Sequence, residues 1–240
     1  MYKETPLDSI SIPLKPLIRL QPEKLNAVLG QLLVPTQISL IHGPERAPLT
    51  ALAHEIVVAG TRKGTSKSVF LDSGSNYSPS LVRSICANDD ELRNVPSCIT
   101  VGEVLGLSDV EELANQISTL GTVSIVVLDS LTSVLNLSSN PGEVGRQRKL
   151  FHTLELLRFL VNSHNLHVVL TDHSNRAWRA AKSSPVGGNV IRHAVDTIVR
   201  VDKLDTGQNL IRILVEQSPL SIESNAIILR TSKRGFKSIN

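Results

Sequence analysis

The sequence is poor in cysteine and has no long apolar run, and these two shortages exclude several classes of protein. Only Cys86 and Cys98 occur in 240 residues. Two cysteines do not make a disulfide framework, so we expect a reduced, cytoplasmic protein. The longest apolar runs, such as residues 124–128, have the length of a strand, far below the roughly 20 residues that cross a bilayer. Residues 1–11 contain no apolar signal core, which argues against export.

Neither sign of charge dominates the composition. The chain has 25 Lys and Arg against 22 Asp and Glu, a net charge of +3, which is too small to indicate nucleic-acid binding by itself. The basic residues are nevertheless clustered in residues 175–203, and Lys233, Arg234 and Lys237 form a second group near the end. Such clusters are typical of polyanion-binding surfaces, but also of ordinary solvated loops.

Apolar segments of strand length alternate with amphipathic segments of helix length. The expected strands are residues 37–42, 68–72, 98–101, 123–129, 166–172, 197–202, 209–216 and 226–230. The expected helices are residues 22–33, 49–60, 80–87, 108–120 and 145–162. Strands that are apolar throughout and separated by helices predict an α/β fold with a mainly parallel central sheet, helices on both faces and antiparallel strands at the C-terminal edge. Residues 1–21, which contain three prolines, are predicted to be an N-terminal arm, and residues 22–240 a single core domain.

The first predicted strand-to-helix turn has the length of a phosphate-binding P-loop, G-x-x-x-x-G-K-[ST]. Gly43 and Thr50 fit this pattern, but Pro48 replaces its second glycine and Leu49 replaces its lysine. Proline has no N–H to donate to a phosphate, and leucine carries no charge. On these eight residues alone, an ordinary turn between a strand and a helix is the simpler interpretation.

Further motifs follow in a fixed order along the chain. The segments that carry them are residues 69–79 (VFLDSGSNYSP), 126–132 (VVLDSLT), 146–150 (RQRKL), 168–173 (VVLTDH) and 185–197 (PVGGNVIRHAVDT). With Gly43 as the anchor, the chain from Pro22 to Phe236 resembles the catalytic core of the RecA/RadA recombinase family. The resemblance implies a RecA-like P-loop NTPase core.

The resemblance also assigns roles to individual positions. The family's catalytic glutamate falls on Gly74, its sensor glutamine on His173 and its magnesium-associated aspartate on Asp129. Asp129 could hold a magnesium-bound water, but we favour a simpler role as a strand-end residue that caps nearby N–H groups. His173 could still donate a hydrogen bond. We therefore expect no catalytic residue, no bound metal and no cofactor, with ATP and Mg present only if the altered loop still binds them.

In this family the segment that precedes residues 185–197 is a DNA-binding loop. Here it is polar and holds the only tryptophan of the chain between two arginines. Basic side chains can neutralise phosphates, and an aromatic ring can stack on an unpaired base. The expected DNA-binding residues are Arg176, Trp178, Arg179, Lys182, Gly187, Gly188 and Asn189. A protein interface is the alternative for this segment, and a third possibility is that it contacts neither ligand.

Three functions of different classes remain open. The first is a recombinase paralog that does not hydrolyse ATP and acts as an accessory or mediator in homologous recombination and DNA repair. It would bind single-stranded DNA, an active RadA-type recombinase or another paralog. The second is an atypical DNA-dependent ATPase with residual activity, in which Arg46 or a neighbouring subunit supplies the missing charge. The third is a structural subunit of a paralog complex. Each is compatible with a cytoplasmic homo- or hetero-oligomer without a membrane partner.

Overall fold

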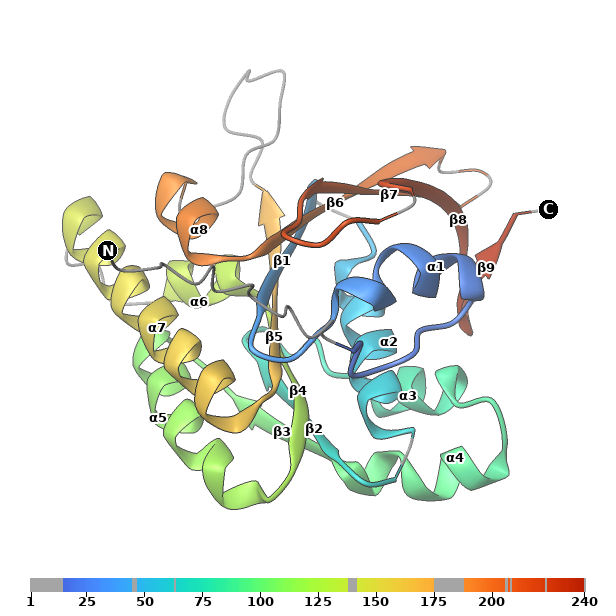
Figure 1. Cartoon of the computed structure of the whole chain (residues 1–240), viewed down its shortest axis with the longest axis horizontal. Helices are drawn as coiled ribbons and strands as arrows, with labels where there is room; N and C mark the ends of the chain where they lie inside the picture. Colours follow the sequence, from blue (N-terminus) through green and yellow to red (C-terminus); the bar gives the residue numbers. More distant parts are fainter. Residues whose placement is uncertain are drawn as a thin grey trace, which may run out of the picture.

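A nine-stranded sheet forms the centre of the structure, a computed structural model (Figure 1). The described residues are 15–44, 47–62, 64–137, 142–174, 188–205, 207, 209–222 and 224–239. The strands are β1 Ile38–Pro44, β2 Lys67–Asp72, β3 Ile99–Glu103, β4 Val123–Asp129, β5 His167–Ser174, β6 Thr197–Asp205, β7 Leu210–Gln217, β8 Ala226–Ser232 and β9 Gly235–Ser238. Their order in the sheet is β3-β2-β4-β5-β1-β6-β7-β8-β9.

The sheet is parallel from β3 to β6 and antiparallel from β6 to β9. The central strands β4 and β5 are buried because helices cover them on both sides, which is why their sequences are apolar instead of alternating. The predicted α/β fold, with a mainly parallel sheet and antiparallel C-terminal strands, is confirmed.

Helices cover the two faces of the sheet in separate groups (Figure 1). They are α1 Glu23–Val28, α2 Leu49–Thr61, α3 Pro79–Ile85, α4 Asp89–Asn94, α5 Leu107–Ile117, α6 Leu131–Leu137, α7 Gly142–His164 and α8 Gly188–Ala194. Helices α1 and α2 belong to one apolar cluster, whereas α5, α6, α7 and α8 belong to the other. Among the described helices, none is both long enough and apolar enough to cross a bilayer.

The predicted helix at residues 22–33 is shorter than expected. Helix α1 ends at Val28 and a 3-10 turn, Gly30–Leu32, follows it. Leu29, Leu32 and Leu33 are all fully buried, so packing of this turn into the core replaces the last part of a regular helix.

Three helices and one strand were not predicted because they are too short to develop a period. These elements are α4, α6, α8 and β9. The signal for α4 was nevertheless present in the sequence. Asn88 accepts the N–H of Glu91, and the Glu91 carboxylate accepts the N–H of Ala87, which is a reciprocal arrangement close to a capping box.

Only part of the predicted N-terminal arm lies within the described residues. Residues 1–14 fall outside them. In the part that follows, the N–H of Leu17 donates to the carbonyl of Leu33, and Ile18 and Leu20 are buried in the same cluster as α2. Residues 17–20 therefore contribute apolar side chains to the core.

A buried histidine connects β5 to β1 and to the segment before it. Nδ1 of His167 donates to the carbonyl of Val34 at 2.7 Å, and Nε2 accepts the hydroxyl of Ser39 at 2.9 Å. Burial is the largest influence on this ring and lowers the pKa of His167 from 6.5 to about 4. The imidazole is therefore neutral in the folded protein at pH 7.

We expect this histidine to make folding pH-dependent between pH 6.5 and 4. The unfolded chain binds a proton at His167 below pH 6.5, whereas the folded chain does so only near pH 4, so stability falls as pH falls through this window. The loss between pH 7 and pH 5 is about 2 kcal/mol. Urea unfolding at both pH values would measure it. His167→Gln is the control, and an equal loss in that variant would contradict the assignment.

Candidate functional site

Several predicted site residues lie at one edge of the sheet. Gly43, Asp129 and His173 lie at the carboxyl ends of β1, β4 and β5, and the carboxyl ends of neighbouring parallel strands meet at the same edge. Gly43 is paired with His173 across the ladder. Thr50, in the first turn of α2, is hydrogen-bonded to Asp129. The structure thus brings together four of the residues that the sequence singled out.

The carboxylate of Asp129 accepts hydroxyl groups from two sides. The hydroxyl of Thr50 donates to Oδ2 at 2.8 Å, and the hydroxyl of Thr171 donates to Oδ1 at 2.5 Å. Asp129 is fully buried, and its main-chain carbonyl also accepts the N–H of Ser73. We expected Asp129 to cap N–H groups, but the bonds described for its carboxylate come from hydroxyls. The side chain ties α2 and β5 to β4.

In the described part of the loop between β1 and α2, backbone N–H groups form hydrogen bonds within the loop. The N–H of Ala47 donates to the carbonyl of Pro44, and the N–H of Leu49 donates to the carbonyl of Ala47. Pro44 and Pro48 have no N–H. At these four positions, therefore, no backbone donor points toward a bound anion.

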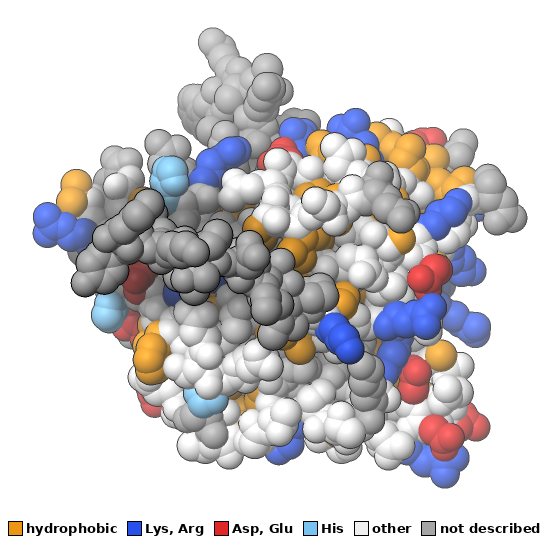
Figure 2. Space-filling view, in the orientation of Figure 1, with side chains coloured by type: hydrophobic (Ala, Val, Ile, Leu, Met, Phe, Trp, Pro, Cys, Tyr) orange, Lys and Arg blue, Asp and Glu red, His pale blue; other side chains and the backbone are white. Residues whose placement is uncertain are grey.

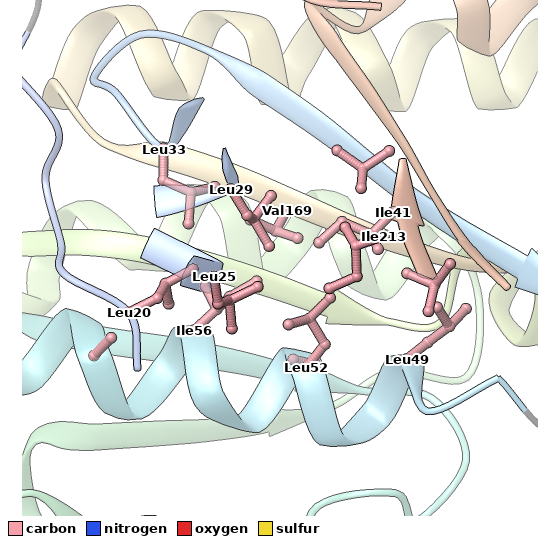
Figure 3. Packing of buried hydrophobic residues seen from close by; sticks show 14 of the residues in the cluster. Leu20, Leu25, Leu29, Leu33, Ile41, Leu49, Leu52, Ile56, Val169 and Ile213 are labelled. Atoms are coloured by element: carbon pink, nitrogen blue, oxygen red, sulfur yellow. The ribbon is translucent and has the colours of Figure 1, made fainter. Parts of the chain in front are cut away.

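Leu49, at the position of the P-loop lysine, packs into the core. Its side chain has no exposed surface and belongs to the apolar cluster between α2 and the sheet. Figure 3 shows Leu49 at the start of α2, in one layer with Leu52, Ile41 and Ile213. The side chain therefore contributes to the apolar core, close to Gly43, and presents no polar group at this end of the sheet.

The turn after β2 is closed by its own aspartate. The carboxylate of Asp72 accepts the N–H groups of Gly74, Asn76 and Tyr77 at 2.9–3.1 Å. Gly74, where the resemblance places the catalytic glutamate, adds no side chain, and Asp72 is committed to the turn. This turn therefore offers no carboxylate that could activate a water molecule.

His54, a buried residue of α2, was not among the predicted site residues. Its Nδ1 donates to the carbonyl of Thr50 at 2.7 Å, and its Nε2 accepts the N–H of Ser78 at 2.9 Å. Burial is the main cause that lowers the pKa of His54, so the ring is neutral and holds the start of α2 against the turn after β2. The ring of Tyr77 stacks on it.

The hydrogen bond that we expected from the ring of His173 stays a prediction. Its main-chain carbonyl accepts the hydroxyl of Thr132 at 3.3 Å. Nδ1 is buried and has no hydrogen-bond partner among the described residues. The same Thr132 hydroxyl also donates to the buried carboxylate of Asp172.

The predicted DNA-binding residues lie almost entirely outside the described part of the chain. Arg176, Trp178, Arg179, Lys182 and Gly187 belong to residues 175–187, which are not described. Gly188 and Asn189 begin α8, but the side chain of Asn189 is not described. Their contacts to DNA therefore remain a prediction.

The described residues of this site do not fit a triphosphate with its magnesium ion. A P-loop needs converging N–H groups, a lysine at the phosphates and a Thr or Ser hydroxyl on the metal. Here two N–H groups stay within the turn, Leu49 is in the core and the Thr50 hydroxyl donates directly to Asp129. Instead, hydrogen bonds and apolar packing of the site residues connect the loop, α2 and the ends of β2, β4 and β5.

Comparison with known proteins finds several distant relatives that are named as DNA repair proteins. The chain is 24% identical over 225 residues to "DNA repair protein RAD51" of Mycosarcoma maydis, covering 85% of this chain and 65% of that protein. It is 27% identical to "DNA repair protein RadA" of Bacillus subtilis, covering 83% of this chain but only 40% of the relative. The chain thus spans less than two thirds of these two proteins.

Another relative matches over nearly its full length. "DNA repair and recombination protein RadB" of Thermococcus kodakarensis is 22% identical, with 90% of this chain and 97% of that protein covered. A crystal structure of the RadB recombinase superposes with a TM-score of 0.72 at 18% identity, covering 90% of this chain and 96% of the other. This likeness confirms the RecA-like fold expected from the sequence.

The family model named Rad51 matches residues 17–238. It includes every motif from which the recombinase resemblance was inferred, from the loop at Gly43 to the segment that ends at Thr197. Since the match takes in well over half of the sequence, the chain belongs to the Rad51 family.

Proposed function

We propose that this chain is a member of the Rad51 family that acts in recombination and DNA repair without hydrolysing ATP. All three relatives carry DNA repair in their names, RadB also carries recombination, and this role is extended to the chain from them. Its ligands would be single-stranded DNA, an active recombinase of the same family, or both.

The observation that carries the proposal is the position of Leu49. The lysine of a P-loop stabilises the β- and γ-phosphates both in the bound nucleotide and in the transition state. Leu49 takes that place in the sequence, and its side chain is buried among apolar residues. A charge-assisted hydrogen bond to phosphate contributes about 1.5–3 kcal/mol, and its absence alone would weaken nucleotide binding by roughly tenfold or more.

Two further features support the same proposal independently. The turn after β2 holds Gly74 where the family has its catalytic glutamate, and Asp72 is occupied by three backbone N–H groups. Loss of the phosphate-binding lysine and of the base together removes both binding and chemistry. Under this proposal, the fold serves to present surfaces that bind DNA or a protein partner.

Calorimetry with ATP, with and without magnesium, tests the nucleotide part of the proposal. We expect no measurable binding at micromolar protein and millimolar nucleotide, and no phosphate release with or without oligonucleotide. Tight binding of ATP·Mg, together with turnover that Asp129→Ala abolishes, would show instead an atypical ATPase.

The DNA part is tested separately with a fluorescent single-stranded oligonucleotide. Arg176→Ala and Arg179→Ala should each weaken binding and reduce its salt dependence, because each removes a cation that can neutralise a phosphate. Unchanged binding in both variants would exclude residues 175–187 as the contact. Co-purification with an ATPase-competent family member, without any DNA binding, would favour a structural subunit.

A further inference from the structure

A hairpin at the end of the sheet carries four cations and no carboxylate. Strands β8 and β9 are joined by a tight turn, and Arg230, Lys233, Arg234 and Lys237 are all exposed. No Asp or Glu occurs from residue 224 to residue 239. In Figure 2 Lys and Arg side chains gather on the side of the molecule where Figure 1 draws β8 and β9.

Two cations of the hairpin lie next to each other across its two strands. Arg230 and Lys237 are directly opposite in the antiparallel ladder and therefore extend from the same face of the hairpin. Like charges in this relation destabilise a sheet, so the pair is not explained by folding. Lys233 and Arg234 follow at the turn, about 10 Å along the strands, a distance over which one DNA strand carries about three phosphates.

A fifth cation is held beside the hairpin by a specific contact. Nζ of Lys24, an exposed residue of α1, donates to the carbonyl of Ile239 at 2.7 Å, directly after β9. The contact places the ammonium group beside the last strand without removing its charge. The basic surface thus extends from the β8–β9 hairpin onto α1.

The carboxylates of the neighbouring helices are engaged elsewhere. Glu23 of α1 is paired with Arg19 at 2.7 Å. Glu55 of α2 lies beneath Gly235, but it is almost completely buried and is paired with Arg62 at 3.4 Å. Neither pairing involves a cation of the hairpin.

From this arrangement we infer that the β8–β9 hairpin, together with Lys24, is a contact surface for the phosphate backbone of a nucleic acid. The surface offers flexible cations but no aromatic side chain on which a base could stack, since Phe236 is buried. Contacts of this kind position a nucleic acid without reading its sequence. The inference shares its ligand class with the proposed function but rests on different residues from the predicted loop at residues 175–187.

The test is the salt dependence of oligonucleotide binding. The probes are a fluorescein-labelled 30-residue oligo-dT and a 30-base-pair duplex of mixed sequence. Lys233→Gln/Arg234→Gln should weaken binding of either probe at 0.1 M salt, roughly tenfold for each phosphate that is no longer neutralised. The slope of log K against log salt should fall by about 1 for each such phosphate. The matched control is Arg93→Gln/Arg148→Gln, which removes the same charge from α4 and α7 and should leave affinity unchanged.

Several outcomes would overturn the inference. One is a hairpin variant that binds like the native protein while Arg176→Ala/Arg179→Ala binds more weakly, in which case the proposed function stands and only the hairpin is excluded. If the affinity of the control variant fell as far as that of the hairpin variant, the effect would come from net charge alone and not from the hairpin. Polyglutamate that displaces the oligonucleotide as well as unlabelled DNA of equal charge does would identify an acidic protein as the ligand instead.

Discussion

Leu49→Lys is expected to lower the free energy of unfolding by about 4 kcal/mol and to leave nucleotide binding absent. The substitution restores the lysine of a P-loop in the sequence, but Leu49 has no exposed surface and lies in the apolar cluster under α2. Burial of a leucine contributes about 2 kcal/mol, and an ammonium group without a partner in the same place costs at least as much again.

Urea unfolding and calorimetry with ATP·Mg measure the two parts of this prediction. In a protein of this size the loss corresponds to a melting temperature lower by about 8–16 °C. Leu49→Met is the matched control, since it conserves volume and should cost less than about 1.5 kcal/mol. A lysine variant that is as stable as the methionine variant and binds ATP would mean that position 49 faces the phosphates after all.

Gly43→Ala should destabilise the protein by about 3 kcal/mol. A Cβ added at Gly43 would overlap the carbonyl oxygen of Val201 in β6 and would lie 2.9 Å from the Cβ of Ala47. Val201 is fixed by the ladder with β7 and Ala47 by its hydrogen bond to Pro44, so neither can move aside at low cost. Gly43 is therefore required for packing at the β1 terminus, whether or not a phosphate ever binds there.

Thermal unfolding followed by circular dichroism tests this prediction, with an expected fall of about 6–12 °C in melting temperature. Gly74→Ala is the control, because the nearest atom to its added Cβ is the side-chain amide nitrogen of Asn76 at 3.2 Å, farther away than either of the two atoms beside Gly43. If the two alanine variants had the same melting temperature, close packing around Gly43 would not be the reason for the glycine.

The replacement of the P-loop lysine by leucine and the close packing of the loop are physically connected. Once residue 49 is apolar, the start of α2 can be buried against Ile41 and Ile213. Once no metal separates them, the hydroxyl of Thr50 can donate directly to Asp129. Under the proposed function, a site that once bound a ligand has become a set of structural contacts between α2 and the sheet.

Much of the fold could be predicted from local patterns. The segments at residues 123–129 and 166–172 each contain an uninterrupted apolar run, which is typical of strands covered on both faces, and they form most of β4 and β5. Short elements could not be predicted this way. Helix α6 has seven residues and strand β9 has four, and their formation depends on neighbours that are distant in the sequence.

Most members of the candidate site were predictable, but its geometry was not. Gly43, Thr50 and Asp129 were selected by motif position alone, and they do lie at one edge of the sheet. No local pattern indicated that His54 connects Thr50 to Ser78, because Ser78 comes within reach of this histidine only when the turn after β2 packs against α2.

The sequence by itself determined the α/β class, the family and the absence of a lysine and a glutamate at two decisive positions, because these depend on residue type and order. Only the tertiary structure decided where Leu49 points, what Asp129 binds and that Arg230 lies opposite Lys237. These facts depend on distances between segments far apart in the chain, and such distances are fixed only when the sheet and its helices pack together.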